Sequence, residues 1–269
     1  MKALKYILYG LVIAAAAGLL AYQVFVEKNL DSSNITKCVL IMIGAVIGML
    51  KPRKNHRIVS NKKAAYQKAY AEHIQNAFED DPKLETKFYN AVHDYNQNKP
   101  AAAIAKLEKL RRDCQRSADL RAVTVFTALC YDDMGLYEKS VPLYEAAISM
   151  RPSSSLCSNL GLACFRLGDE EAAEKAYQDA IRIDPKNAYA HNNYATLWFR
   201  RGAYTESLRC AEAAISLNAG LTQALSNAAL CCAMLKDQEG YEKYYRRAVA
   251  NGYDGAKIKN FLARMDTEI

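Results

Sequence analysis

A repeated pattern in the second half of the chain constrains its fold more than any other feature. An Ala followed by Ile or Val recurs at intervals of 33, 34 and 34 residues, and these pairs begin at Ala147, Ala180, Ala214 and Ala248. Glycines keep the same interval at Gly135, Gly168 and Gly202. A unit of this length cannot bury its own apolar face, so neighbouring units must stack into a solenoid.

Each unit contains two helical stretches with a short turn at the glycine, as in the stretch from Arg166 to Glu170. Small residues occupy the positions where two helices would cross, at Ala128, Gly161, Ala195 and Ala229. Large aromatic residues alternate with them, at Tyr131, Tyr144, Tyr177 and Trp198. The pattern predicts two antiparallel helices in each unit.

Residues 121–255 resemble tetratricopeptide repeats. Copies at 121–153, 154–187, 188–221 and 222–255 carry the family's pattern of Leu-Gly, Tyr, Gly, Ala, Tyr, Ala and Pro. The second copy keeps it best, from Asn159-Leu160-Gly161 through Pro185. The third copy has Ala219 in place of the closing Pro and the fourth has Lys236 in place of the turn Gly, so we expect different helix ends there. The resemblance implies an all-α fold, a right-handed α–α superhelix.

The segments that flank the four copies also have helical patterns. Residues 84–120 resemble a degenerate repeat with a longer connection, and 256–269 would form a C-terminal capping helix. Residues 56–83 are predicted to form a basic amphipathic linker helix, because apolar side chains recur every four residues, at Tyr66, Tyr70, Ile74 and Phe78. We expect this stripe to pack on the first repeat and the basic residues to contact anionic lipid headgroups.

The N-terminal residues 1–55 are predicted to form a membrane anchor with two spans. Residues 6–26 carry no charge and are long enough to cross the hydrocarbon core, which is about 30 Å thick. The second apolar run reaches 17 residues, 34–50, only if Lys37 extends to the headgroups. A cleaved signal peptide is the alternative for the first run, although its length exceeds a usual signal core.

The distribution of charge predicts the topology of this anchor. Residues 1–70 contain eleven Lys and Arg against two acids, whereas the rest of the chain has a net charge of −2. Six basic residues between 51 and 63 follow the second run, which predicts an integral membrane protein with its N-terminus and repeats in the cytoplasm. A repeat region without basic excess argues against a nucleic-acid partner.

The resemblance implies that the first helices of the repeats line a concave groove. Asn159, Asn193 and Asn227 recur on these helices at 34-residue spacing. An amide can both donate to and accept from a peptide backbone, and some members of the family clamp an extended peptide with asparagines at this place. The alternative is that these amides bond between neighbouring repeats.

Aromatic residues paired with arginines complete the predicted groove. Phe165 and Phe199 each precede an arginine, Arg166 and Arg200, and helical periodicity points Tyr189 and Asn192 inward. An aromatic ring beside an arginine could receive an acidic or carboxylate-bearing peptide. The alternative for the arginines is helix capping, because a cation is favoured at a helix C-terminus.

No residue pattern predicts catalysis, a metal or a cofactor. The eight cysteines include no pair at metal-ligand spacing and fall mostly at small interior positions, and the four histidines are scattered. The sequence therefore predicts a membrane-tethered, non-catalytic scaffold or adaptor that binds a peptide or protein partner. The alternative is a structural assembly subunit that self-associates as a homo-oligomer or packs permanently in a membrane-associated complex.

Overall fold

A computed structural model describes the backbone of residues 54–267 and the side chains of residues 62–265. The predicted spans, 6–26 and 34–50, lie outside the described residues. The chain divides into two compact units, residues 1–58 and 59–269, and the description below concerns the second. In the described part of the chain no helix has both the length and the apolar character needed to cross a bilayer.

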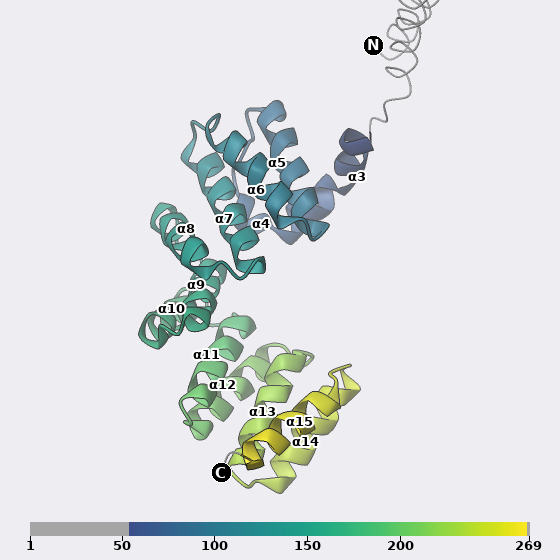
Figure 1. Cartoon of the computed structure of the whole chain (residues 1–269), viewed down its shortest axis with the longest axis vertical. Coiled ribbons are helices and arrows are strands. Elements are labelled where there is room, and N and C mark those ends of the chain that lie inside the picture. Colours follow the sequence, from purple (N-terminus) through teal and green to yellow (C-terminus); the bar gives the residue numbers. More distant parts are fainter. Residues whose placement is uncertain (1–53, 268–269) are drawn as a thin grey trace, which may run out of the picture. The chain divides into compact units, whose positions relative to one another are not determined.

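The repeats are four pairs of antiparallel helices. The pairs are α7 (Ser117–Asp133) with α8 (Tyr137–Met150), α9 (Ser154–Leu167) with α10 (Glu170–Ile183), α11 (Ala188–Arg200) with α12 (Tyr204–Leu217), and α13 (Thr222–Met234) with α14 (Gln238–Ala250). Each helix packs on its partner and on the next helix along the chain (Figure 1). First helices also contact one another, α9 with α11 and α11 with α13. The expected all-α repeat array is confirmed for this part of the chain.

One residue in the left-handed region makes the turn inside each pair. Gly135, Gly168 and Gly202 have φ angles of 70°, 88° and 74°. Lys236 takes a φ of 62°, and the following Asp237 N–H donates to the Cys232 carbonyl at 2.9 Å, as the Asp169 N–H does to the Cys164 carbonyl at 3.0 Å. The expectation of a different helix end at Lys236 was therefore wrong, because the stacked helices hold the turn in its usual conformation.

The repeat without its closing proline also keeps its geometry. At the end of α12 the Asn218 N–H donates to the Ala214 carbonyl and the Leu221 N–H donates to the Asn218 carbonyl. The same two bonds close the preceding repeat, from Asp184 to Ala180 and from Asn187 to Asp184. The helix end expected to differ at Ala219 is thus unchanged, because backbone hydrogen bonds are sufficient to make the turn.

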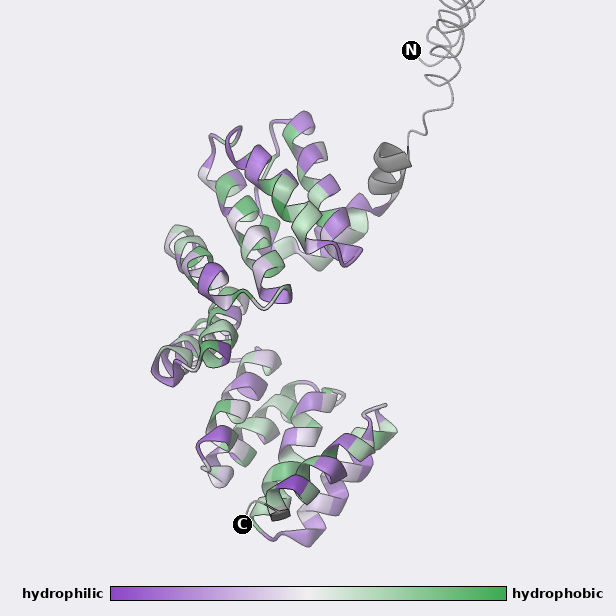
Figure 2. Ribbon diagram, in the orientation of Figure 1, coloured by the Kyte–Doolittle hydropathy of each residue, from purple (hydrophilic) through white to green (hydrophobic). Residues whose placement is uncertain are grey.

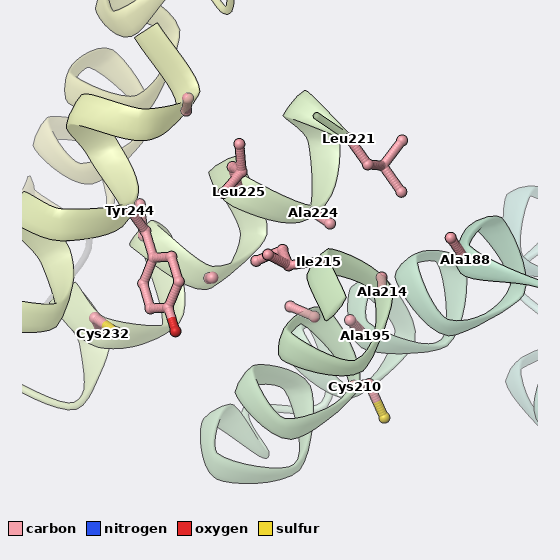
Figure 3. Close-up of a cluster of buried hydrophobic side chains, with 14 of the residues drawn as sticks. Ala188, Ala195, Cys210, Ala214, Ile215, Leu221, Ala224, Leu225, Cys232 and Tyr244 are labelled. Atoms are coloured by element: carbon pink, nitrogen blue, oxygen red, sulfur yellow. The ribbon is translucent and has the colours of Figure 1, made fainter. Parts of the chain in front are cut away.

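The core of the array lies between helices and is built from small residues around large aromatic ones. Figure 2 shows hydrophobic and hydrophilic residues alternating along the helices, as expected when one side of each is buried. Ala195 and Ala214 are fully buried where α11 meets α12, and Tyr244 belongs to the same cluster (Figure 3). Tyr177 is 1% exposed, and its ring approaches the position that a side chain on Gly161 would occupy. Glycine therefore permits the close crossing of α9 and α10.

Helices flank the four repeats on both sides. α5 (Pro82–Asn96) and α6 (Pro100–Arg111) form a further pair, so the segment expected as a degenerate repeat is a helical hairpin. Asp81 caps α5 by accepting from the backbone N–H groups of Lys83 and Leu84 at 2.8 and 3.0 Å. At the other end α15 (Gly255–Thr267) packs on α13 and α14.

The predicted linker helix is interrupted. Instead of one helix over residues 56–83, the chain forms α3 (Lys54–Ala69), the short α4 (Ala71–Ile74) and a turn in which Asn76 and Phe78 have φ angles near 60°. The Phe78 N–H leaves the helical pattern to donate to the Asp119 carboxylate at 2.6 Å. The apolar stripe nevertheless packs as one surface against α5 and α7, in a cluster that includes Tyr66, Tyr70, Ile74, Phe78, Phe88 and Phe126.

Candidate protein-binding face

The first helices of the second, third and fourth repeats carry two rows of polar or aromatic residues. One row consists of Ser155, Tyr189 and Gln223, and the other of Asn159, Asn193 and Asn227. The two rows lie on the same face, because residues four apart on a helix are neighbours. We call these six residues the first-helix face. Tyr189 is 61% exposed, whereas the three asparagines are half-buried. The rows therefore combine an accessible aromatic ring with amide groups at regular spacing.

Two of the three predicted asparagines link neighbouring repeats. Asn227 Nδ2 donates to Asn192 Oδ1 at 3.1 Å and to Thr196 Oγ1 at 3.0 Å, which joins α13 to α11. Asn193 Nδ2 donates to Ser158 Oγ at 3.2 Å, which joins α11 to α9. These bonds fit the alternative that the amides connect repeats. They leave acceptor capacity on Asn227 Oδ1 and donor capacity on Asn193 Nδ2, so a ligand role for these groups stays a prediction.

Asn159 differs from the other two asparagines. Its amide has no hydrogen-bond partner among the described residues, although the side chain is half-buried on the same face. Ser155, one turn earlier, donates its hydroxyl to Glu72 Oε2 at 2.5 Å. The second repeat therefore presents the amide that is most available for a ligand.

The predicted pairing of each Phe with the arginine that follows it is replaced by a pairing across repeats. The Arg200 guanidinium lies 3.6 Å from the centre of the Phe165 ring, and it also donates to the Phe165 carbonyl at 3.1 Å. Arg200 Nε lies 2.7 Å from Glu170 Oε1. Arg200 thus binds side-chain and backbone groups of the preceding repeat. The alternative that the arginines only cap their own helices does not include this contact, because it considers each helix alone.

The neighbouring Arg201 was not identified from the sequence. It bonds Glu170 at 2.9 Å and Glu174 at 2.6 Å, and these bonds are the leading reason why the pKa values of both carboxyl groups are lowered. The other copies have an apolar residue at this position: Met134, Leu167 and Leu235. An arginine in place of an apolar residue is the sequence feature that could have identified Arg201. Arg200 and Arg201 together fix α11 on α10.

The remaining predicted residues are dispersed. Phe199 lies against Tyr204 and, at 5.8 Å between ring centres, against Phe261 of α15. Arg166 is exposed at the end of α9, and Asn192 is 7% exposed beneath the first-helix face. Phe199 is therefore in contact with the terminal helix, so the predicted site residues do not converge on one pocket.

The cysteine side chains in the described chain are free thiols in apolar surroundings. Six of the seven are buried, and burial raises the pKa of Cys130 and of Cys232 to about 12. Because the thiolate is the nucleophile and the metal ligand, such thiols are unreactive. Within residues 62–265 no group of His, Cys, Asp and Glu side chains has an arrangement that could hold a metal ion.

Comparison with known families agrees with the paired helices and their spacing. Models of the tetratricopeptide repeat match residues 128–154, 154–187 and 171–220. Residues 128–220 of this chain match the tetratricopeptide repeat (TPR). The matches overlap in sequence and cover the first, second and third repeats.

Curated relatives share only short stretches with this chain. A TPR repeat-containing protein of Methanocaldococcus jannaschii is 34% identical over 71 residues, which are 26% of this chain and 12% of that protein. The BBSome complex member BBS4 of Bos taurus is 33% identical over 76 residues, 28% of this chain and 15% of BBS4. The chain therefore matches less than a sixth of the length of either relative.

Several solved structures share the fold. YrrB superposes with a TM-score of 0.52 at 18% identity, covering 74% of this chain and 98% of YrrB. BtubC from P. vanneervenii gives a TM-score of 0.55 at 18% identity, over 73% and 93% of the two chains. MamA gives 0.53 at 18% identity, over 62% and 91%. At this identity the likeness concerns the arrangement of helices alone.

Proposed function

We propose that this TPR protein is a membrane-tethered, non-catalytic adaptor. Its first-helix face binds a peptide or protein partner, and its N-terminal segment holds the repeats at the cytoplasmic surface of a membrane. Binding concentrates the partner at that surface. The proposal has two parts, a binding face and a tether, and each has its own support.

The binding face is supported by the second and third repeats. The single observation that carries it is the pairing of a free amide, Asn159, with an aromatic ring, Tyr189, that is 61% exposed on the same face. An amide can hold a peptide backbone, and tyrosine provides contact area at a low cost in conformational entropy. YrrB, which shares this fold, is a TPR protein with an unusual peptide-binding site.

The tether is supported by the sequence of the N-terminal segment. Residues 6–26 are uncharged, and basic residues follow the second apolar run. In the described part of α3, Lys68 is exposed, whereas Tyr66 on the opposite side is 7% exposed and packs against α5. A helix of this kind can face anionic headgroups with its charges while its aromatic side holds the repeats.

Capture of partners from detergent-solubilised membranes tests the binding face. The bait is the full chain, and the variants are Asn159→Ala, Tyr189→Ala and the double variant. Glu171→Ala with Lys175→Ala is the matched control, because both side chains are exposed on the second helix of the same repeat. We expect one set of partners to be retained by wild type and control and reduced at least fivefold by the double variant. Equal recovery with all baits would contradict the proposal.

The oligomeric state of the purified protein tests the alternative function. An adaptor with an open first-helix face is expected to remain monomeric in detergent over a wide range of concentrations. A structural subunit would give a defined oligomer whose mass does not change on dilution. Light scattering of the protein–detergent complex separates the two, and an oligomer that persists in the Tyr189→Ala variant would favour the structural role.

A further inference from the structure

A segment that precedes the repeats covers the positions of the first repeat that correspond to the first-helix face. We call Tyr70–Phe78 the strap. Phe126 stands 33 residues before Asn159 and so occupies the asparagine position in the first repeat. The Tyr70 ring packs on Phe126 with 4.9 Å between ring centres. The position that is half-buried in the other repeats is fully buried here, so the strap closes this end of the face.

The backbone of the strap is anchored in the core near both of its ends. Phe78 is 3% exposed, and its N–H donates to Asp119, which is itself 3% exposed. Arg121, also buried, donates through Nη1 to the carbonyls of Glu72 and His73 at 3.3 Å. These contacts are charge-assisted and involve the buried side chains of Asp119 and Arg121, so the backbone of the strap is held firmly.

Two exposed side chains of the strap reach the junction of the first and second repeats. The Glu72 carboxylate accepts from the Ser155 hydroxyl at 2.5 Å, and Arg151 donates to the Gln75 side-chain carbonyl. Both Glu72 and Gln75 are exposed, and such contacts contribute little individually, typically up to about 1 kcal/mol. A competing group could therefore replace these side-chain contacts without releasing the anchored backbone of the strap.

Positive charge gathers where these contacts are made. Arg121 Nη2 donates to the Arg151 carbonyl at 3.3 Å, which brings the two residues together. Burial lowers the pKa of Arg121, the nearby Arg151 lowers it further, and Glu72 opposes the shift. Glu72 thus compensates the charge of Arg121, to which Arg151 adds a second positive charge, and a carboxylate is the ligand that suits the position.

We propose that Arg151 and Ser155 form a subsite for an acidic side chain of the partner peptide, and that the strap fills this subsite in cis through Glu72 and Gln75. The inference rests on the proposed function, because it identifies the partner of the first-helix face as an acidic peptide. Ser155 belongs to that face, one turn before Asn159. A bound peptide would place a carboxylate at Arg151 and continue along the face toward Tyr189, displacing the side chains of Glu72 and Gln75.

Emptying the subsite in the full chain tests the inference. Glu72→Ala with Gln75→Ala removes the two side chains that contact Ser155 and Arg151, and Glu79→Ala, an exposed residue beside the strap, is the control. The probe is a labelled hexapeptide that copies residues 71–76, followed by fluorescence anisotropy. We expect the double variant to bind the probe at least tenfold more tightly than wild type or the control. Adding Arg151→Ala should abolish the gain.

A second peptide, in which alanine replaces the residues that correspond to Glu72 and Gln75, tests whether these two side chains are needed for binding. We expect it to bind none of the proteins. Equal affinity of the first probe for wild type and the emptied variant, no binding to either, or binding that ignores Arg151→Ala would each overturn the subsite. If the probe binds as expected while partner capture is insensitive to Asn159 and Tyr189, the subsite stands and the proposed adaptor face fails.

Discussion

Each repeat turn requires one residue in the left-handed region, and in the fourth repeat a lysine fills that role. The left-handed conformation costs a residue with a Cβ roughly 1 kcal/mol, whereas glycine adopts it freely. Lys236 nevertheless makes the backbone bonds found at the glycine turns. The stacked helices therefore determine the turn, and the fourth repeat carries a local strain that the others lack.

Lys236→Gly is expected to relieve this strain. The free energy of unfolding should rise by about 1 kcal/mol, because glycine removes the steric cost at φ 62°. Urea denaturation followed by circular dichroism measures the change. Lys236→Ala is the control and should stay within about 0.5 kcal/mol of wild type, since alanine keeps the Cβ. A loss of stability in Lys236→Gly would show that the lysine side chain contributes more than its backbone conformation costs.

Gly161→Ala should have the opposite sign. Alanine is favoured over glycine inside a helix by about 1 kcal/mol, but here its Cβ would lie 2.6 Å from the buried Tyr177 ring. We expect a net destabilisation of about 1–3 kcal/mol, which is typical of overpacking. Gly220→Ala is the control, because its nearest neighbours lie 3.7 Å away. Stabilisation by Gly161→Ala would mean that α9 and α10 do not cross as closely as described.

At the scale of elements, the strap joins segments that are distant in sequence. His73 lies within it, with its Nδ1 atom buried and without a hydrogen-bond partner in the described structure. Burial lowers the pKa of His73 below its ordinary value of 6.5, and Arg121 adds to the shift, whereas Glu72 opposes it. The folded protein therefore takes up this proton at a lower pH than the unfolded chain does.

Acidification should loosen the strap through His73. A lowered folded pKa contributes stability that is present above pH 6.5 and is lost as the pH falls through the folded value. Hydrogen exchange of residues 70–78 should accelerate between pH 7.5 and 5.5, after correction for intrinsic rates. In His73→Gln this dependence should largely disappear, while other segments behave as in wild type. The same acceleration in both proteins would exclude His73 as the cause.

The sequence predicts the elements better than it predicts contacts between them. The 34-residue interval identifies the helix pairs from α7 to α14, because alanines and glycines recur wherever two helices cross closely. At the linker, the four-residue spacing of apolar side chains misleads. Such side chains form one surface whether the helix continues to Phe78 or stops at Ile74. The strap depends on Asp119 and Ser155, which lie 41 and 83 residues away from their partners.

Local sequence patterns also do not predict which side chains pair in the candidate site. Phe165 and Arg166 are adjacent in sequence, yet the ring stacks with Arg200 of the next repeat. Asn193 and Asn227 were identified by their interval, but the interval does not distinguish an amide that joins repeats from one that awaits a ligand. Packing between repeats determines both the partner of Phe165 and the hydrogen bonds of the asparagines. Composition and periodicity give no information about this packing.

On the scale of the whole molecule, the proposed membrane anchor would determine, through its topology, which proteins the repeats can meet. A single reporter cysteine, Lys175→Cys, is suitable because residue 175 is exposed on α10. Native cysteines in the described chain provide a low background, since six are buried and burial raises the pKa of Cys114 to about 11. We expect an impermeant maleimide to label the reporter only after lysis. Labelling of intact cells at the rate seen in lysates would place the repeats outside.

The central claim is that the partner binds on the first helices of the second and third repeats. Hydrogen–deuterium exchange of the captured complex, compared with the free protein in the same detergent, measures this directly. The account predicts protection of residues 154–160 and 188–194, with little change in α10 and α12. Protection confined to α10, α12 or the C-terminal helix, with the first helices unchanged, would contradict it.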